Sequence, residues 1–180
     1  CKDGGAITIN GRVAGIDGEK REDYRRQCAF VLEDFPFTDT VTAKDIGDIY
    51  GPFYKDFDKE KYKELLNQLE IPSSKRMRKL STGMKLKVQM AFAFSYDSKV
   101  LFLDEPTASL DSFARKDLYQ LIGEYMESGR RNIIWTTHLT EELDRMADYL
   151  LILEKGKQIV FEEKEALMSK YRMVKGGKHQ

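Results

Sequence analysis

The 180-residue sequence has few cysteines and no long apolar run, and both shortages limit what the protein can be. Its two cysteines, Cys1 and Cys28, show no metal-binding spacing and form no disulfide framework, so a reducing cytosol is the default environment. The richest apolar runs, 91–94 and 149–153, are far shorter than the ~20 residues of a membrane-spanning helix. Any membrane connection is therefore expected to come through a partner.

An excess of charge of either sign is also missing, because 30 basic residues balance 30 acidic ones. Non-specific binding of nucleic acid needs a basic face, so we expect no nucleic-acid partner. Hydrophobic residues make up 41% of the chain and charged residues 33%, which favours a globular domain over a disordered chain. The length is sufficient for one sizeable hydrophobic core.

The apolar pattern predicts an α/β fold with a largely parallel sheet. Short apolar runs, which predict buried strands, alternate with stretches of helical periodicity. The predicted strands are 28–32, 100–103 and 132–135, and the predicted helices are 84–96, 118–126 and 141–147. Strands and helices that alternate at this spacing argue for a sheet covered by helices on both faces.

Two strand pairs and a helical insert are expected beside this sheet. Segments 6–10 and 12–16 flank a turn at Gly11, and segments 149–153 and 158–161 flank a turn at 155–156. In the insert, Thr42 and Asp45 have the spacing of a capping box and begin a short helix, with Ile46 and Ile49 facing inward. A second amphipathic helix, with apolar residues from Tyr62 to Leu69, is expected to be closed by Pro72.

Two carboxylates, Asp104 and Glu105, follow the apolar run 100–103. A buried strand delivers such acids to the carboxyl edge of the sheet, where ligands bind in open α/β folds. The first acid suits magnesium, and the second could orient and deprotonate an attacking water. The alternative is a strand end with two solvated acids.

Ser81, Thr82 and Gly83 stand where a helix is about to begin. A hydroxyl and free backbone N–H groups at a helix start attract an anion, because the helix dipole favours negative charge there. The alternative is an ordinary serine N-cap. Farther along, Asp111 lies in a turn after the acidic strand, and His138 follows the strand 132–135 at the same sheet edge.

In this order and spacing, the segments resemble the ATP-binding-cassette (ABC) ATPase family over about residues 4–163. The matching segments are LSTGM at 80–84, VLFLDEP at 100–106, ASLD at 108–111 and TTH at 136–138. The resemblance implies a P-loop NTPase-like, mostly parallel sheet with a small antiparallel β part and an inserted helical subdomain. It divides the chain into a first part of the ATPase core (1–33), the helical subdomain (34–80), the rest of the core (81–165) and a C-terminal tail (166–180).

The resemblance also implies roles for single residues. Glu105 would be the catalytic base, and His138 the switch histidine that contacts the γ-phosphate of ATP. Asp104 would be associated with Mg²⁺, and Glu33, where the family usually has glutamine, could also approach that ion. The signature residues Ser81, Thr82 and Gly83, with Asp111 of the D-loop, would contact ATP held by a second subunit.

One motif of the family is missing from the sequence: no segment fits the phosphate-binding G-x-x-x-x-G-K-[ST]. Without its lysine and backbone N–H groups, the phosphates of ATP have no primary site. We expect this loop in a preceding segment of roughly 40–55 residues, which would hold a strand and a helix. The chain as given is therefore expected to be inactive alone.

The implied partners are transmembrane permease subunits and a second ATPase domain, in a homodimer or heterodimer at the cytoplasmic face of the membrane. Glu33 and the LSTGM signature, together with the stretches Phe35–Asp45 and Phe53–Asp58, resemble those of bacterial exporters of peptides or peptide antibiotics. Two alternatives remain open: a non-transport ABC ATPase, or a regulatory half-site that offers only its signature. The sequence does not indicate the transported substrate.

Overall fold

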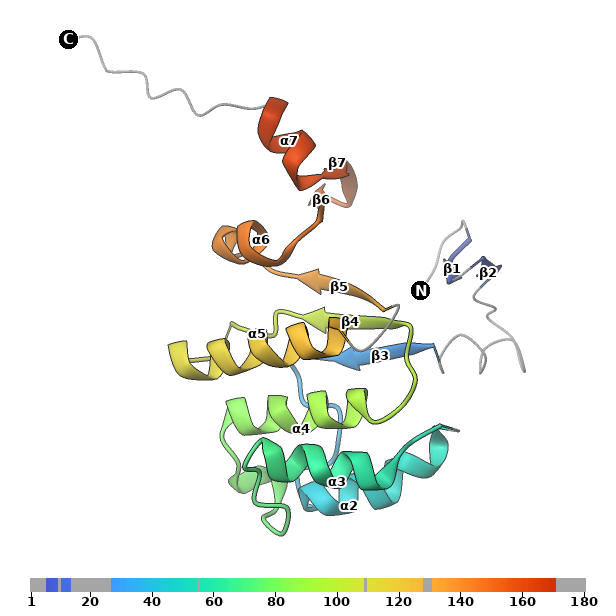
Figure 1. The fold of residues 1–180 in the computed structure, drawn as a ribbon, viewed down its shortest axis with the longest axis vertical. Helices are drawn as coiled ribbons and strands as arrows, with labels where there is room; N and C mark the ends of the chain where they lie inside the picture. The colour runs from blue at the N-terminus through green and yellow to red at the C-terminus, as the bar shows by residue number, and fades with distance from the viewer. Residues whose placement is uncertain are drawn as a thin grey trace, which may run out of the picture. The chain divides into compact units, whose positions relative to one another are not determined.

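The computed structural model describes residues 6–9, 11–13, 27–54, 56–108, 110–127 and 131–170. These residues belong to two compact units, Cys1–Thr136 and Thr137–Gln180. The first unit contains the main sheet and most of the helices, and the second contains a hairpin with two short helices (Figure 1). No described helix combines the length and the apolar composition that crossing a membrane requires.

The main sheet consists of three parallel strands, β3 (Cys28–Val31), β4 (Val100–Asp104) and β5 (Asn132–Thr136), with β4 in the middle. In their register, Val31 lies opposite Leu103 and Asp104 lies opposite Thr136. The parallel sheet predicted from the apolar runs is thus confirmed. All three strands end at the same edge, which brings together the residues that follow β3 and β4 within the first unit.

One face of this sheet is buried under α4 (Thr82–Phe94) and α5 (Ser112–Glu127). On that face Val31 and Leu103 are at most 1% exposed. On the other face Phe30 stacks on Phe102, with 4.9 Å between ring centroids, and Phe30 remains 49% exposed. Among the described residues of the first unit, α4 and α5 thus cover one face, and helical cover of the second face stays a prediction.

The helix α4 connects the sheet to the helical subdomain (Figure 1). It begins at Thr82, two residues earlier than predicted, because Ser81 caps it. Residues 88–94 are all buried, as expected of a helix that is enclosed by neighbouring elements. The Phe92 ring lies 4.9–6.1 Å, centroid to centroid, from five other rings, which belong to Phe37, Tyr54, Phe57, Tyr62 and Tyr96.

The helical subdomain begins with α2 (Ala43–Tyr50), whose predicted capping box is confirmed. The Thr42 N–H donates to the Asp45 carboxylate at 2.9 Å, and the Asp45 N–H donates to Thr42 Oγ1 at 3.1 Å. These hydrogen bonds, the one from the Thr42 backbone first, hold the pKa of Asp45 below its ordinary value. A short 3₁₀ turn (η1, Gly51–Phe53) follows, and another (η2, Met77–Lys79) precedes Leu80.

Two details of this subdomain differ from the predictions. Ile49 is 47% exposed, because the buried face of α2 is formed by Ala43, Ile46 and Gly47, about 100° away from it around the helix. The second helix, α3 (Lys59–Gln68), ends four residues before Pro72, so proline does not close it.

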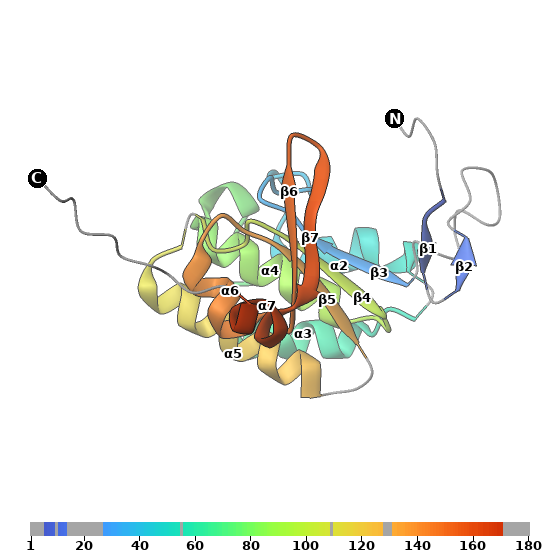
Figure 2. The ribbon, with the colours of Figure 1, turned by 90° about the horizontal axis from the view of Figure 1, so that it is seen from above.

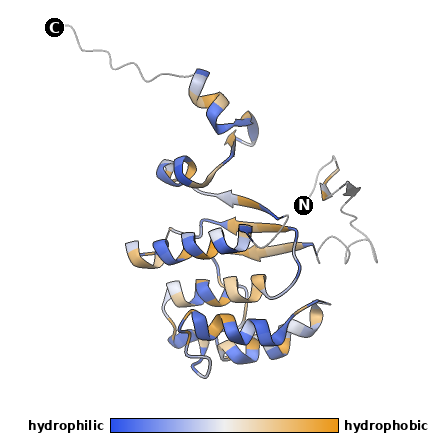
Figure 3. Ribbon diagram, viewed as in Figure 1, coloured by the Kyte–Doolittle hydropathy of each residue, from blue (hydrophilic) through white to orange (hydrophobic). Residues whose placement is uncertain are grey.

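Both predicted strand pairs form antiparallel hairpins. The first consists of β1 (Thr8–Ile9) and β2 (Arg12–Val13). Of the other residues predicted for it, 6 and 7 are not in a strand, and 10 and 14–16 lie outside the described ones. The second consists of β6 (Tyr149–Glu154) and β7 (Lys157–Glu163), long strands joined by the predicted turn (Figure 2). Short helices α6 (Thr140–Met146) and α7 (Lys164–Lys170) flank the second hairpin in the chain. Figure 3 shows how strongly apolar residues dominate the strands of the main sheet.

Candidate functional site

The acidic residues at the end of β4 are held by Thr136, the last residue of β5. The Thr136 hydroxyl donates to the Asp104 carboxylate at 2.6 Å. The Glu105 N–H points to the same residue, 3.1 Å from the Thr136 carbonyl oxygen and 3.2 Å from its hydroxyl oxygen. Glu105 adopts a φ of 44°, a left-handed conformation that costs a non-glycine residue free energy and is common at functional sites. Thr136 therefore fixes the carboxylate of Asp104 and the backbone of Glu105.

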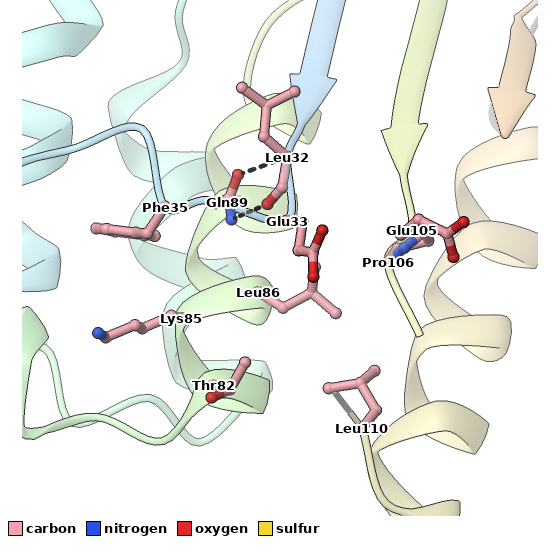
Figure 4. A pocket seen from close by; sticks show the side chains of 10 residues that line it. All are labelled: Leu32, Glu33, Phe35, Thr82, Lys85, Leu86, Gln89, Glu105, Pro106 and Leu110. Carbon is pink, nitrogen blue, oxygen red and sulfur yellow. Dashed lines mark hydrogen bonds between the residues drawn. The ribbon is translucent and has the colours of Figure 1, made fainter. Parts of the chain in front are cut away.

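Glu33 and Glu105 line one small cavity of about 50 Å³, although 71 residues separate them in the sequence. Thr82, the first residue of α4, also lines it (Figure 4). The complete lining is Leu32, Glu33, Phe35, Thr82, Lys85, Leu86, Gln89, Glu105, Pro106 and Leu110. The cavity has room for water, whereas ligand pockets usually measure about 300–1,000 Å³.

Two carboxylates, those of Glu33 and Glu105, give the otherwise largely apolar lining of this cavity a net negative charge. Lys85 is the one cation among its ten lining residues, and its ammonium lies 5.9 Å from the centre of the Phe35 ring. Carboxylates gathered in this way repel phosphate groups unless a cation lies between them. The described residues contain no cluster of three or more side chains able to cage a metal. The carboxylates of Glu33 and Glu105 are of the donor type that binds Mg²⁺, an ion commonly held by one or two carboxylates together with substrate phosphates.

The signature segment meets the start of α5. Ser81 Oγ accepts a hydrogen bond from the Met84 N–H at 3.2 Å, so the N-cap interpretation of Ser81 is correct. An anion-binding role for Ser81 stays a prediction beside it. A Cβ placed on Gly83 would lie 3.5 Å from both Leu110 and Ala114. The Asp111 carboxylate caps α5 by accepting from the Ala114 N–H at 2.8 Å, so the signature and the turn of Asp111 are neighbours in one chain.

His138 belongs to the second unit. The loop that carries it is held by Thr137, whose hydroxyl donates to the buried Glu142 carboxylate at 2.6 Å and accepts from the Leu139 N–H at 3.1 Å. The juxtaposition of His138 with Glu105 stays a prediction.

Reasoning from sequence missed two residues of this site, Thr136 and Gln89. The first belongs to the TTH segment, but its bond to Asp104 depends on the strand register. The second is a polar residue within an otherwise apolar stretch of α4, which could have indicated a buried partner.

We expect Thr136→Val to weaken the site more than the fold. Valine keeps the β-branched shape and the backbone carbonyl that accepts from the Glu105 N–H, but its side chain neither donates to Asp104 nor offers that N–H a second acceptor. In a complete protein that turns over ATP, loss of this positioning should lower kcat about tenfold or more. Unfolding stability should fall by only about 1 kcal/mol. Thr136→Ser keeps the hydroxyl and serves as the control. Unchanged kcat in the valine variant would show that Thr136 does not position the acids.

A comparison with protein families decides the assignment. A family model described as ABC transporter matches residues 2–108, more than half of the chain. The chain belongs to the ABC transporter family. Within this ABC domain the match ends just after the acidic strand, so it includes LSTGM and VLFLDEP.

Two relatives and one solved structure agree with this assignment. The ABC domain is 31% identical over 140 residues to the ABC transporter ATP-binding protein YtrB of Bacillus subtilis (strain 168), covering 78% of this chain and 48% of the relative. It is 30% identical over 176 residues to the Nod factor export ATP-binding protein I of Rhizobium sp. (strain N33). That match covers 94% of this chain and 56% of the relative. The chain thus spans about half the length of these relatives. A solved ATP binding subunit of an ABC transporter superposes with a TM-score of 0.78 at 27% identity, covering 93% of this chain and 70% of that one.

Proposed function

We propose that this ABC domain provides catalytic and signature residues to an ATP-hydrolysing transporter motor. The observation that best supports this proposal is the shared cavity. Three segments far apart in the sequence place Glu33, Thr82 and Glu105 around it. Those residues include two of the carboxylates and one of the signature residues that the family resemblance singles out.

In the proposed reaction, Glu105 orients a water molecule and accepts its proton while the water oxygen attacks the γ-phosphorus of ATP. The bond between that phosphorus and the β–γ bridging oxygen breaks, and ADP and phosphate are released. Thr136 holds the backbone of Glu105 and the carboxylate of Asp104 in place for this step. Asp104 and Glu33 would hold Mg²⁺, which when bound neutralises charge on the phosphates. His138, from the second unit, would contact the γ-phosphate of the bound ATP.

We further propose that the signature residues Ser81, Thr82 and Gly83, together with Asp111, act on ATP held by a second ATPase domain. The small volume of the cavity supports this, since a nucleotide needs far more room than about 50 Å³. The α4 N-terminus also offers exposed Ser81 and Thr82 to an approaching phosphate. The second domain could be a copy of this chain or a different one.

The membrane partners of this motor would be permease subunits that bind at the cytoplasmic face of the membrane, near Glu33. Export is the direction we favour, because the rhizobial relative is an export protein by name. The transported substrate would be chosen by the permease.

A regulatory half-site is the alternative that one observation favours. The sequence has no G-x-x-x-x-G-K-[ST] motif, so this chain by itself offers no phosphate cradle. Such a half-site would still present its signature to a partner. Glu105, held beside Asp104 by Thr136, argues for the hydrolytic role instead.

The purified 180-residue chain is predicted to hydrolyse ATP no faster than a buffer blank. The reason is the missing cradle for the β- and γ-phosphates. Phosphate release with Mg²⁺ and ATP measures this, and a longer chain that carries a phosphate-binding loop ahead of residue 1 should gain turnover. Magnesium-dependent turnover by the 180-residue chain would contradict the prediction. A longer chain that stays inactive while binding ATP would favour the regulatory half-site.

A further inference from the structure

Gln89 makes an unusual pair of hydrogen bonds within the first unit. Its side-chain oxygen accepts from the Leu32 N–H, and its side-chain NH₂ donates to the Leu32 carbonyl, both at 3.0 Å (Figure 4). Gln89 is only 4% exposed. Both halves of a buried amide are thus satisfied by one residue that is 57 positions away.

These bonds hold the backbone at the point where β3 ends. Val31 is the last residue of β3 paired with β4, and Leu32 connects it to Glu33. A strand neighbour would offer Leu32 one acceptor and one donor, and the Gln89 amide supplies both. Leu32, the residue before Glu33, is therefore hydrogen-bonded to helix α4 at the point where pairing of β3 with β4 has ended.

The same helix also carries the signature residues and the centre of the aromatic cluster. Gln89 lies eight residues after Ser81, about 12 Å along the helix axis. One turn later, Phe92 packs against the five rings of that cluster. A displacement of α4 thus acts on the signature, on the helical subdomain and, through Gln89, on Leu32.

We propose that Gln89 is a positioning residue that sets where Glu33 stands relative to Glu105. The two carboxylates line one cavity, and Gln89 lines the same cavity. Through the Leu32 backbone, motion of the signature helix changes the separation of these acids. This inference rests on the proposed roles of Glu33 and Glu105.

Tyr96 provides a matched control on the same two elements. Tyr96 lies two residues after the end of α4, and its hydroxyl donates to the Cys28 carbonyl at 3.2 Å. Cys28 is the first residue of β3, at the opposite end of the strand from Glu33. Tyr96→Phe removes that bond alone. Gln89→Met removes both bonds to Leu32 while nearly keeping the side-chain volume, and Gln89→Leu is a second variant with a different shape.

The link itself can be tested in the 180-residue chain by amide hydrogen exchange. Exchange of the Leu32 amide should be at least about fivefold faster in Gln89→Met than in the parent, since it loses a buried acceptor. Tyr96→Phe should leave it within about twofold. Equal exchange in parent and both Gln89 variants would overturn the inference.

Function is tested in the complete transporter by a double-mutant cycle. Gln89→Met should lower kcat for ATP at least about fivefold with KM within about twofold, because positioning and not binding is lost. In a Glu33→Ala background the same substitution should have no further effect. Tyr96→Phe should lower kcat equally with and without Glu33, if at all.

Two outcomes separate the inference from the proposed function. If Glu33→Ala impairs turnover while both Gln89 variants turn over normally, the positioning role is wrong and the role of Glu33 stands. If Glu33→Ala leaves turnover unchanged, the positioning role of Gln89 is wrong, and if transport per ATP is also unchanged, the role of Glu33 is wrong as well. If the losses of kcat caused by Gln89→Met and by Glu33→Ala add up in the double variant, the positioning role of Gln89 is also wrong.

Discussion

Glu105→Gln should abolish most of the ATP turnover of the complete protein and leave its fold intact. The amide is isosteric with the carboxylate but cannot accept the proton of the attacking water. General bases typically contribute about 10²–10⁴-fold, so we expect kcat to fall at least about a hundredfold. The Glu105 N–H and the hydrogen bond between Thr136 and Asp104 do not involve the changed side chain. Steady-state phosphate release and the midpoint of thermal unfolding measure the two effects. Normal turnover would remove Glu105 from the mechanism.

The same variant gives a test of the signature. With hydrolysis blocked, it should accumulate as an ATP-bound dimer in size-exclusion chromatography. Adding Ser81→Arg places a long side chain at the exposed start of α4 and should return the protein to the monomer. Because Ser81 also caps α4, the fold of this variant is checked by circular dichroism. Ser74→Arg, at an exposed serine of the helical subdomain, is the control and should stay dimeric. A dimer that tolerates Ser81→Arg would exclude the signature from the interface.

Glu33→Ala is expected to uncouple ATP turnover from transport. Glu33 is exposed, lines the cavity with Glu105 and follows the residue that Gln89 holds. Its truncation should lower transport per ATP hydrolysed at least about tenfold. Glu33→Gln should preserve turnover, because it restores the amide that is usual in the family. Transport into vesicles and ATP turnover are measured on the same preparations.

The neighbouring carboxylate supplies the control for Glu33. Asp34 is also exposed but does not line the cavity, so Asp34→Ala removes the same charge one residue away. It should leave transport per ATP within about twofold of the parent. If Glu33→Ala and Asp34→Ala behave alike, Glu33 is a solvated strand end.

The strands could be predicted from sequence because each is a contiguous apolar run. Once β4 is placed, Asp104 and Glu105 necessarily follow at its carboxyl end, so these positions needed no tertiary information. Ile49 was assigned wrongly because a three-residue spacing from Ile46 does not reveal where the buried face is centred. That centre is set by the Tyr62 ring, whose atoms would lie 2.5 Å from a Cβ on Gly47.

The hydrogen bonds that organise the site could not be predicted in this way. The bond of Thr136 to Asp104 depends on which residues of β4 and β5 lie opposite each other. The bonds of Gln89 to Leu32 join positions 57 residues apart. These two residues come together only because α4 packs against β3. A pattern of neighbouring residues in the sequence cannot indicate a contact across 57 positions. The positions of Ser81, Gly83 and Asp111 could be named, but their contacts with ATP depend on a second domain and remain predictions.

The left-handed backbone conformation of Glu105 lowers the stability of the fold, while the side chain at the same position is the proposed general base. A non-glycine residue in this conformation costs roughly 1–2 kcal/mol, which glycine would largely avoid. Laboratory evolution that rewards heat resistance alone would therefore enrich glycine at 105 and discard the carboxylate. A library screened for thermostability therefore needs a turnover screen at every round, because glycine at 105 keeps the fold while removing the proposed general base.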